Sequence, residues 1–160
     1  MSKAASESIR RSYFDVFLSF RGDTRLGFTG NLFNALEKRG IDTFFGGYDF
    51  KSGEVIEASL SEAIEHSRLF VIVLSENYAS SSRCLDELVR ILDFTRDNHR
   101  LVIPVFYYVD PSDVRHQKGI YGEALAMHER RLNPESSEVM KWRNALCQAA
   151  TLSGWAFKDG

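Results

Sequence analysis

The feature that most constrains the fold is an uninterrupted apolar run at residues 69–74, Leu-Phe-Val-Ile-Val-Leu, between two stretches of helical periodicity. A strand buried on both faces has such a run, and helices before and after it are typical of parallel βαβ units. Shorter strand-like runs lie at 13–20, 41–45, 101–108 and 154–157. Helical patterns alternate with them at 28–39, 54–66, 120–132 and 139–150, and a further one begins near residue 84. The sequence therefore predicts an α/β domain of three layers, with a five-stranded parallel sheet and helices on both faces.

Size and charge limit the possible functions. The chain has 160 residues, 44% of them hydrophobic, which is enough for one cored domain. Residues 1–12 are polar and we expect a disordered tail there, which leaves a single domain at 13–160. Lys and Arg number 20 against 22 for Asp and Glu, so the basic surplus typical of nucleic-acid binding is missing.

The location of the protein can also be predicted. No apolar run is long enough to span a bilayer, and residues 1–12 lack the apolar core of a signal peptide. The two cysteines, Cys84 and Cys147, form no CxxC pair and suit a reducing compartment as free thiols. We therefore expect a cytoplasmic or nucleocytoplasmic protein that does not contact a membrane.

Several common sites are excluded by their motifs. The sequence has no GxGxxG after its first strand, no GxxxxGK[ST] and no GxSxG. Its four histidines are scattered without HExxH or cysteine partners, so no metal site is expected. The apolar run at 69–74 is followed by Ser75 and not by an acid, which argues against a phospho-acceptor receiver domain.

Residues 80–91 contain two acids that need an explanation. We expect the helix to begin near Cys84, which places Asp86 and Glu87 in its first turn, where unpaired N–H groups and the helix dipole favour a carboxylate. Glu87 also lies one helical turn from Cys84 and from Ile91, at the edge of an apolar stripe. Its carboxylate is thus either a helix-terminal charge or a group facing a half-apolar cleft.

Loop positions favour the second interpretation. In a flavodoxin-like strand order, the loops at 21–25, 46–54 and 75–83 follow the first three strands and meet at one edge of the sheet. Arg21, the glycine-rich loop and Glu87 are therefore expected to share a cleft. Arg21 alone is equally consistent with a phosphate contact and with a surface ion pair.

Five sequence blocks carry a family resemblance. They are Tyr-Phe-Asp-Val-Phe-Leu-Ser-Phe-Arg-Gly at 13–22, Gly-Ile-Asp-Thr-Phe at 40–44, Ser-Glu-Asn-Tyr-Ala-Ser-Ser-Ser at 75–82, Cys-Leu-Asp-Glu-Leu at 84–88 and Val-Asp-Pro-Ser-Asp-Val-Arg at 109–115. Together they resemble plant TIR (Toll/interleukin-1 receptor-like) domains, which stand at the front of nucleotide-binding, leucine-rich-repeat immune receptors. The resemblance covers residues 13–157, and we expect the family's C-terminal helix to be absent from this chain.

The resemblance implies a flavodoxin-like fold and a domain that hydrolyses NAD+ when it self-associates through TIR–TIR contacts. Nicotinamide and ADP-ribose-type products are expected, with NAD(P) as substrate and no metal. The family's catalytic glutamate falls on Glu87. Its nucleotide-site residues fall on Arg21, Gly22, Asp23, Thr24, Arg25, Gly53, Glu54 and Cys84. Arg83 stands where the family often has tryptophan.

Elementary chemistry is consistent with a single carboxylate. Nicotinamide leaves NAD+ as a neutral molecule, so its departure needs no general acid, unlike the alkoxide released by ordinary glycosidases. An ionised Glu87 would hold the ribose hydroxyls and stabilise the oxocarbenium-like transition state, while Arg21 would face the phosphates. The glycine-rich loop would act as a lid. Two alternatives stay open: a non-catalytic interaction module in defence signalling, and a nucleic-acid-linked activity that makes cyclic nucleotides.

Overall fold

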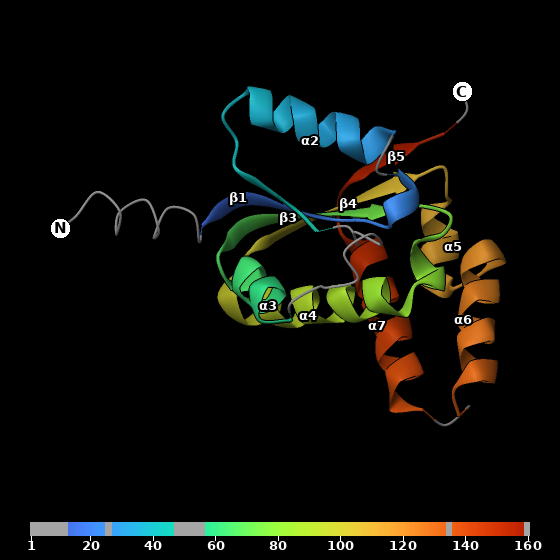
Figure 1. Ribbon diagram of the computed structural model, residues 1–160. Helices are drawn as coiled ribbons and strands as arrows, with labels where there is room; N and C mark the ends of the chain where they lie inside the picture. The colour runs from blue at the N-terminus through green and yellow to red at the C-terminus, as the bar shows by residue number, and fades with distance from the viewer. Residues whose placement is uncertain (1–12, 25–26, 47–56, 134–135, 159–160) are drawn as a thin grey trace.

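The computed structural model describes residues 13–24, 27–46, 57–133 and 136–158. Within them a sheet of five strands forms the centre of the domain (Figure 1). The strands are β1 (Phe14–Ser19), β2 (Thr43–Phe45), β3 (Ser67–Leu74), β4 (Leu101–Tyr107) and β5 (Trp155–Phe157). All four pairings are parallel, in the order β2-β1-β3-β4-β5. The predicted parallel α/β sheet of flavodoxin-like order is confirmed. The expected tail at 1–12 lies outside the described residues.

Helices cover both faces of this sheet (Figure 1). One face is covered by α2 (Phe28–Lys38), and the other by α3 (Glu57–Glu65), α4 (Ser82–Asn98) and α7 (Ser137–Thr151). The short α5 (Pro111–His116) packs on α7, and α6 (Gly119–Arg131) packs on the 3-10 turn η2 (Tyr78–Ser80). A second 3-10 turn, η1 (Gly22–Thr24), lies between β1 and α2 in the chain.

Each face of the sheet has its own hydrophobic core. The larger core lies under α3, α4, α6 and α7, and includes the fully buried Phe17, Phe70 and Trp142. The smaller core lies under α2, where Leu18 and Phe20 of the first strand region meet Phe33. The side chains of alternating β1 residues therefore pack into opposite cores, as expected for a strand buried on both faces.

The start of α4 differs from our sequence-based prediction. The helix begins at Ser82, and the Ser81 hydroxyl caps it by accepting a hydrogen bond from the Cys84 N–H (3.2 Å). Asp86 and Glu87 consequently fall in the second turn, beyond the unpaired N–H groups, and the first turn holds no acid. The prediction that a serine-rich loop precedes the helix was correct, but we had not recognised which serine caps it.

Asp86 and Glu87 face different surroundings. Asp86 is exposed and accepts a hydrogen bond from the indole N–H of Trp142 (2.9 Å), which ties α4 to α7. Glu87 points the other way, into the protein. The interpretation of either acid as a helix-terminal charge was wrong.

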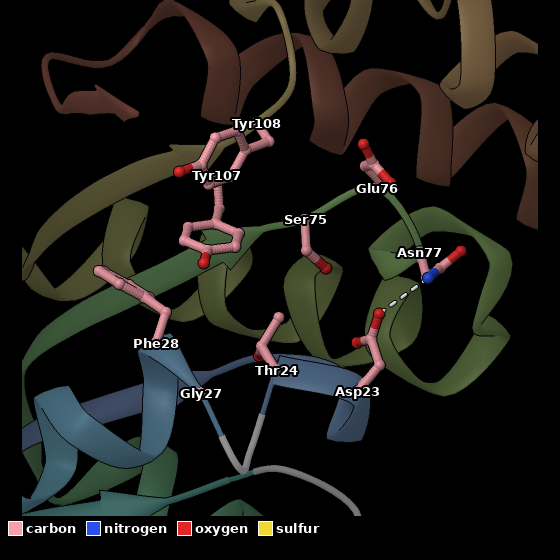
Figure 2. A pocket seen from close by; sticks show the side chains of 9 residues that line it. All are labelled: Asp23, Thr24, Gly27, Phe28, Ser75, Glu76, Asn77, Tyr107 and Tyr108. Carbon is pink, nitrogen blue, oxygen red and sulfur yellow. Dashed lines mark hydrogen bonds between the residues drawn. The ribbon is translucent and has the colours of Figure 1, made fainter. Parts of the chain in front are cut away.

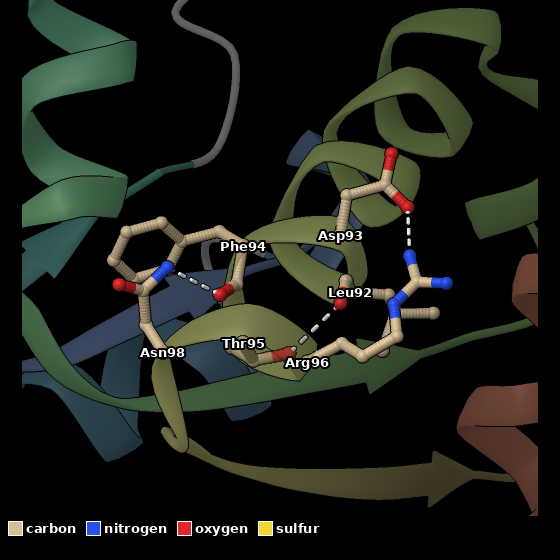
Figure 3. A network of polar contacts seen from close by, with 6 residues as sticks. All are labelled: Leu92, Asp93, Phe94, Thr95, Arg96 and Asn98. Atoms are coloured by element: carbon tan, nitrogen blue, oxygen red, sulfur yellow. Dashed lines mark hydrogen bonds and ion pairs between the residues drawn. The ribbon is translucent and has the colours of Figure 1, made fainter.

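The other end of α4 is closed by local contacts (Figure 3). The Asn98 side chain donates to the Phe94 carbonyl (2.8 Å), and Asp93 pairs with Arg96 on the exposed surface. His99 follows in the left-handed conformation (φ 53°), which ends the helix. Asp93 is thus an exposed acid on the same helix as Glu87, in a contrasting environment.

The last strand approaches β4 closely. A Cβ at position 154 would lie 1.9 Å from the Pro104 carbonyl oxygen, so only glycine fits there. Pro104 itself is tolerated inside β4, although proline normally marks an edge. From the sequence, both tryptophans are expected in the core or between helices; Trp142 is buried, whereas Trp155 is 66% exposed. In the described part of the chain, no helix is long and apolar enough to cross a membrane.

Candidate functional site

The most unusual side chain of the domain is Glu87, an acid that is only 5% exposed. It projects from the second turn of α4 toward the carboxyl end of β1, where it is hydrogen-bonded to Ser19. Acids are almost never this buried unless they are paired or hydrogen-bonded. The expected cleft shared by Glu87, Arg21 and the glycine-rich loop stays a prediction, because most of that loop lies outside the described residues.

Burial controls the ionisation of this acid. Loss of solvation raises the pKa of Glu87 from its ordinary value of 4.5 to about 8, although the Ser19 hydrogen bond and the positive charge of Arg90 both lower it. At neutral pH the carboxyl group is therefore mostly protonated in the isolated domain. The expected role of an ionised Glu87 in catalysis stays a prediction, and it requires the pKa of this acid to fall. Strongly perturbed acids of this kind mark candidate functional sites.

A short chain of hydrogen bonds lies beside this acid. The Tyr78 hydroxyl donates to the Cys84 carbonyl (3.1 Å), and Ser19 Oγ lies 2.9 Å from the Tyr78 hydroxyl oxygen. These bonds tie the carboxyl end of β1 and η2 to the start of α4, next to Glu87.

Cys84 lies beside this chain and is equally buried. Burial raises the pKa of its thiol from 9.0 to about 12, with Glu87 and Asp23 raising it further and the Ser81 hydrogen bond and the Arg21 charge lowering it. Cys84 is therefore an unreactive thiol at neutral pH. These electrostatic contacts also show that the loop after β1 and the start of α4 come together, as the strand order predicted.

Arg21 lies nearer the surface than Cys84 and Glu87. Its guanidinium donates to Ser80 Oγ (2.6 Å) and to the Asn77 carbonyl (3.2 Å), which joins the loops that follow β1 and β3. It borders a cleft of about 370 Å³, here called the basic cleft, between the start of α4 and α6. The positively charged lining residues of the basic cleft are Arg21, Arg83 and Arg131, and His128 lines it beside them.

The basic cleft suits an anion. Among its described lining residues there are three arginines and no acid, and the first N–H groups of α4 lie at its edge. His128 Nδ1 accepts from Arg131 (2.9 Å), so its Nε2–H donates to the Ala79 carbonyl (2.8 Å) and the ring is neutral. Glu87 does not line this cleft; it is buried one helical turn after Arg83 on α4.

The remaining predicted site residues fall into two groups. Gly22, Asp23 and Thr24 form η1, where Thr24 Oγ1 donates to the Arg21 carbonyl (3.1 Å) and Asp23 accepts from the Asn77 amide (2.8 Å). They shape the loop that holds Arg21. Three further predictions, Arg25, Gly53 and Glu54, lie outside the described residues, as does most of the predicted lid.

Sequence reasoning missed Ser19, Tyr78, His128 and Arg131. Ser19 had a readable signal, because it is a polar residue at the carboxyl end of an otherwise apolar run. The other three come from η2 and α6, whose contact with α4 depends on tertiary packing. Among the described residues, no group of three or more His, Cys, Asp or Glu side chains could hold a metal ion.

Together, the fold and this site define a flavodoxin-like α/β domain with a buried acid and a basic cleft at the carboxyl edge of its sheet. A family model described as TIR domain matches residues 13–160. The chain belongs to the TIR domain family.

The chain is similar to the front part of plant resistance proteins. It is 49% identical to disease resistance protein RPV1 of Vitis rotundifolia over 160 residues, and 44% identical to TMV resistance protein N of Nicotiana glutinosa over 152 residues. These alignments cover 99% and 94% of this chain, but only 11% and 13% of those proteins. The chain therefore spans about a tenth of the length of the curated relatives it matches.

A solved structure supports the same assignment. The TIR domains of the activated Roq1 resistosome that directly recognises the pathogen effector XopQ superpose with a TM-score of 0.81 and 48% sequence identity. The match covers 90% of this chain and 87% of that chain. The flavodoxin-like fold and the resemblance to plant immune-receptor TIR domains are both confirmed.

Proposed function

We propose that this domain hydrolyses NAD+ to nicotinamide and an ADP-ribose product when it self-associates in plant defence signalling. The observation that carries the proposal is the buried carboxyl of Glu87 at the carboxyl edge of the sheet, hydrogen-bonded to Ser19 and carried by the helix whose start borders the basic cleft. Such an acid lowers stability at neutral pH, and proteins tolerate that cost mainly at functional sites.

The reaction needs little from the protein beyond electrostatics. The bond between nicotinamide and C1′ of the ribose breaks with its electron pair moving to the nicotinamide nitrogen, and water adds to C1′ and releases a proton. Because the ring leaves as a neutral molecule, no acid has to protonate it. An anionic Glu87 would stabilise the positive charge that develops on the ribose. The NAD+ pyrophosphate would lie on Arg21 in the basic cleft, where charge-assisted hydrogen bonds favour phosphate.

Control by self-association follows from the ionisation of Glu87. In the isolated domain the acid is buried and mostly neutral at pH 7, which is the wrong charge for this role. Substrate and a neighbouring protomer would have to open the covering residues, hydrate the carboxyl group and lower its pKa. Similarity to TIR domains seen in an activated resistosome supports an assembly as the active state.

Nicotinamide release from NAD+ tests the proposal. We expect turnover when the domain is fused to an oligomerising scaffold and much less from the dilute monomer. Glu87→Gln should abolish turnover in the assembly, whereas Asp93→Asn, which alters an exposed acid on the same helix, should keep it. Equal rates for the Glu87→Gln and wild-type assemblies would refute the catalytic role.

The second candidate is a domain that signals through TIR–TIR contacts alone. The burial of Glu87, which does not line the basic cleft, favours it, because a substrate in that cleft would reach the carboxyl group only after rearrangement. The same assay separates the two candidates. An assembled wild-type sample that releases no nicotinamide would select the non-catalytic function.

A further inference from the structure

We propose that a second cleft, at the point where the strand order reverses, binds a small organic cation that carries N–H donors, such as a primary alkylammonium. The cleft, here called the switch-point cleft, has a volume of about 290 Å³ and lies beyond the carboxyl ends of β1, β3 and β4 (Figure 2). Open parallel sheets bind ligands at this point, which the order β2-β1-β3-β4-β5 places between β1 and β3. Of the described residues, none lines both this cleft and the basic cleft.

Aromatic rings form one wall of the switch-point cleft. The rings of Phe28 and Tyr107 lie 4.9 Å apart, and those of Tyr107 and Tyr108 lie 4.7 Å apart at an angle of 87°. Two perpendicular rings make the corner of a cage, and ring faces attract cations through their negative potential. Tyr108 is held in the left-handed conformation (φ 56°), which is rare for an aromatic residue and is typical of functional sites.

The opposite wall supplies hydrogen-bond acceptors. Ser75 is 2% exposed, and its Oγ has no hydrogen-bond partner among the described residues. Figure 2 shows this hydroxyl pointing into the cleft, toward Thr24 and Asp23. Among the described residues, Asp23 accepts through one of its two carboxylate oxygens, from the Asn77 amide. A buried hydroxyl without a partner costs free energy, so a ligand N–H placed there is favourable.

The charges of the lining decide which ligand fits. The described lining residues include two acids, Asp23 and Glu76, and no basic residue. Phosphates and carboxylates are therefore disfavoured, in contrast to the basic cleft. A primary ammonium has three donors and no acceptor, which matches Ser75 Oγ and the other carboxylate oxygen of Asp23. The small volume restricts the ligand to a short chain or a single ring.

Calorimetry and NMR with three probes test the proposal on the wild-type domain. Butane-1,4-diamine should bind saturably and shift the resonances of Tyr107 and Tyr108. Butane-1,4-diol has the same shape without charge, and tetramethylammonium has charge without N–H donors. We expect no saturable binding of the diol and weaker binding of tetramethylammonium.

Two variants test the individual walls. Ser75→Ala should weaken diamine binding about fivefold and leave the domain as stable or more stable, since it removes a hydroxyl without a partner. Tyr108→Gly should weaken it about threefold, because glycine accepts the positive φ and removes only the ring. Asp93→Asn removes an exposed charge elsewhere and should leave binding unchanged.

Three results would overturn the proposal. The first is no saturable binding of the diamine at about 10 mM. The second is equal binding of the diol. The third is an affinity that Asp93→Asn lowers as much as Ser75→Ala does, which would show nonspecific attraction of a cation to an acidic surface.

Discussion

Replacing Glu87 by glutamine should stabilise the domain at neutral pH. Glutamine has nearly the same shape and can keep a hydrogen bond to Ser19, but it cannot ionise. The wild-type acid has a pKa of about 8 when folded and an ordinary value of 4.5 when unfolded. The folded state thus holds its proton more tightly, so wild-type stability is highest below pH 4.5 and falls as the pH rises to 8.

The size of the effect follows from the same values. Each pH unit between the two pKa values lowers the unfolding free energy by about 1.4 kcal/mol. At pH 7 the wild type is therefore about 3 kcal/mol less stable than at acidic pH. Glu87→Gln does not lose this stability. For a domain of this length, the variant should unfold roughly 10 °C higher than the wild type at pH 7. Below pH 4.5 the two proteins should differ little.

Urea and thermal unfolding, followed by circular dichroism from pH 4 to pH 8, measure this difference. Asp93→Asn is the matched control, because Asp93 is an exposed acid of the same helix and should show no comparable gain. The reasoning fails if Glu87→Gln is less stable than the wild type at pH 8. It also fails if the difference between them does not change with pH.

Two further substitutions test local contacts. Tyr78→Phe should cost about 1–2 kcal/mol of unfolding free energy, because it removes the buried hydroxyl that bonds Ser19 and the Cys84 carbonyl; a variant as stable as the wild type would contradict a stabilising role for these bonds. Gly154→Ala should cost about 2 kcal/mol or more, because the new Cβ would lie 1.9 Å from the Pro104 carbonyl oxygen. A Gly154→Ala variant that melts at the same temperature as the wild type would refute this argument.

The fold was predictable because its signals are local. The apolar run at 69–74 lies in β3, the centre of the sheet, and the alternation of strands and helices selects a parallel arrangement. Errors arose where a single contact outweighs the pattern. The helix at α4 begins earlier than expected because Ser81 caps it, and Trp155 is exposed because the short β5 places it there.

The site was predictable in position but not in charge. Arg21 and Glu87 are brought to the same edge of the sheet by the strand order, which follows from the alternation of elements. The neutral state of Glu87 depends on how completely other elements cover it. This burial is not encoded in the spacing of residues along α4.

The most direct measurement is a carbon-13 NMR titration of the Glu87 carboxyl group, assigned by its absence from Glu87→Gln, in the isolated domain and in an enforced assembly with NAD+. We predict titration near pH 8 in the isolated domain and a clearly lower pKa in the assembly that releases nicotinamide. A carboxyl that titrates near 4.5 in the isolated domain would contradict the buried neutral state. An assembly that releases nicotinamide while Glu87 stays protonated would contradict its role as the catalytic anion.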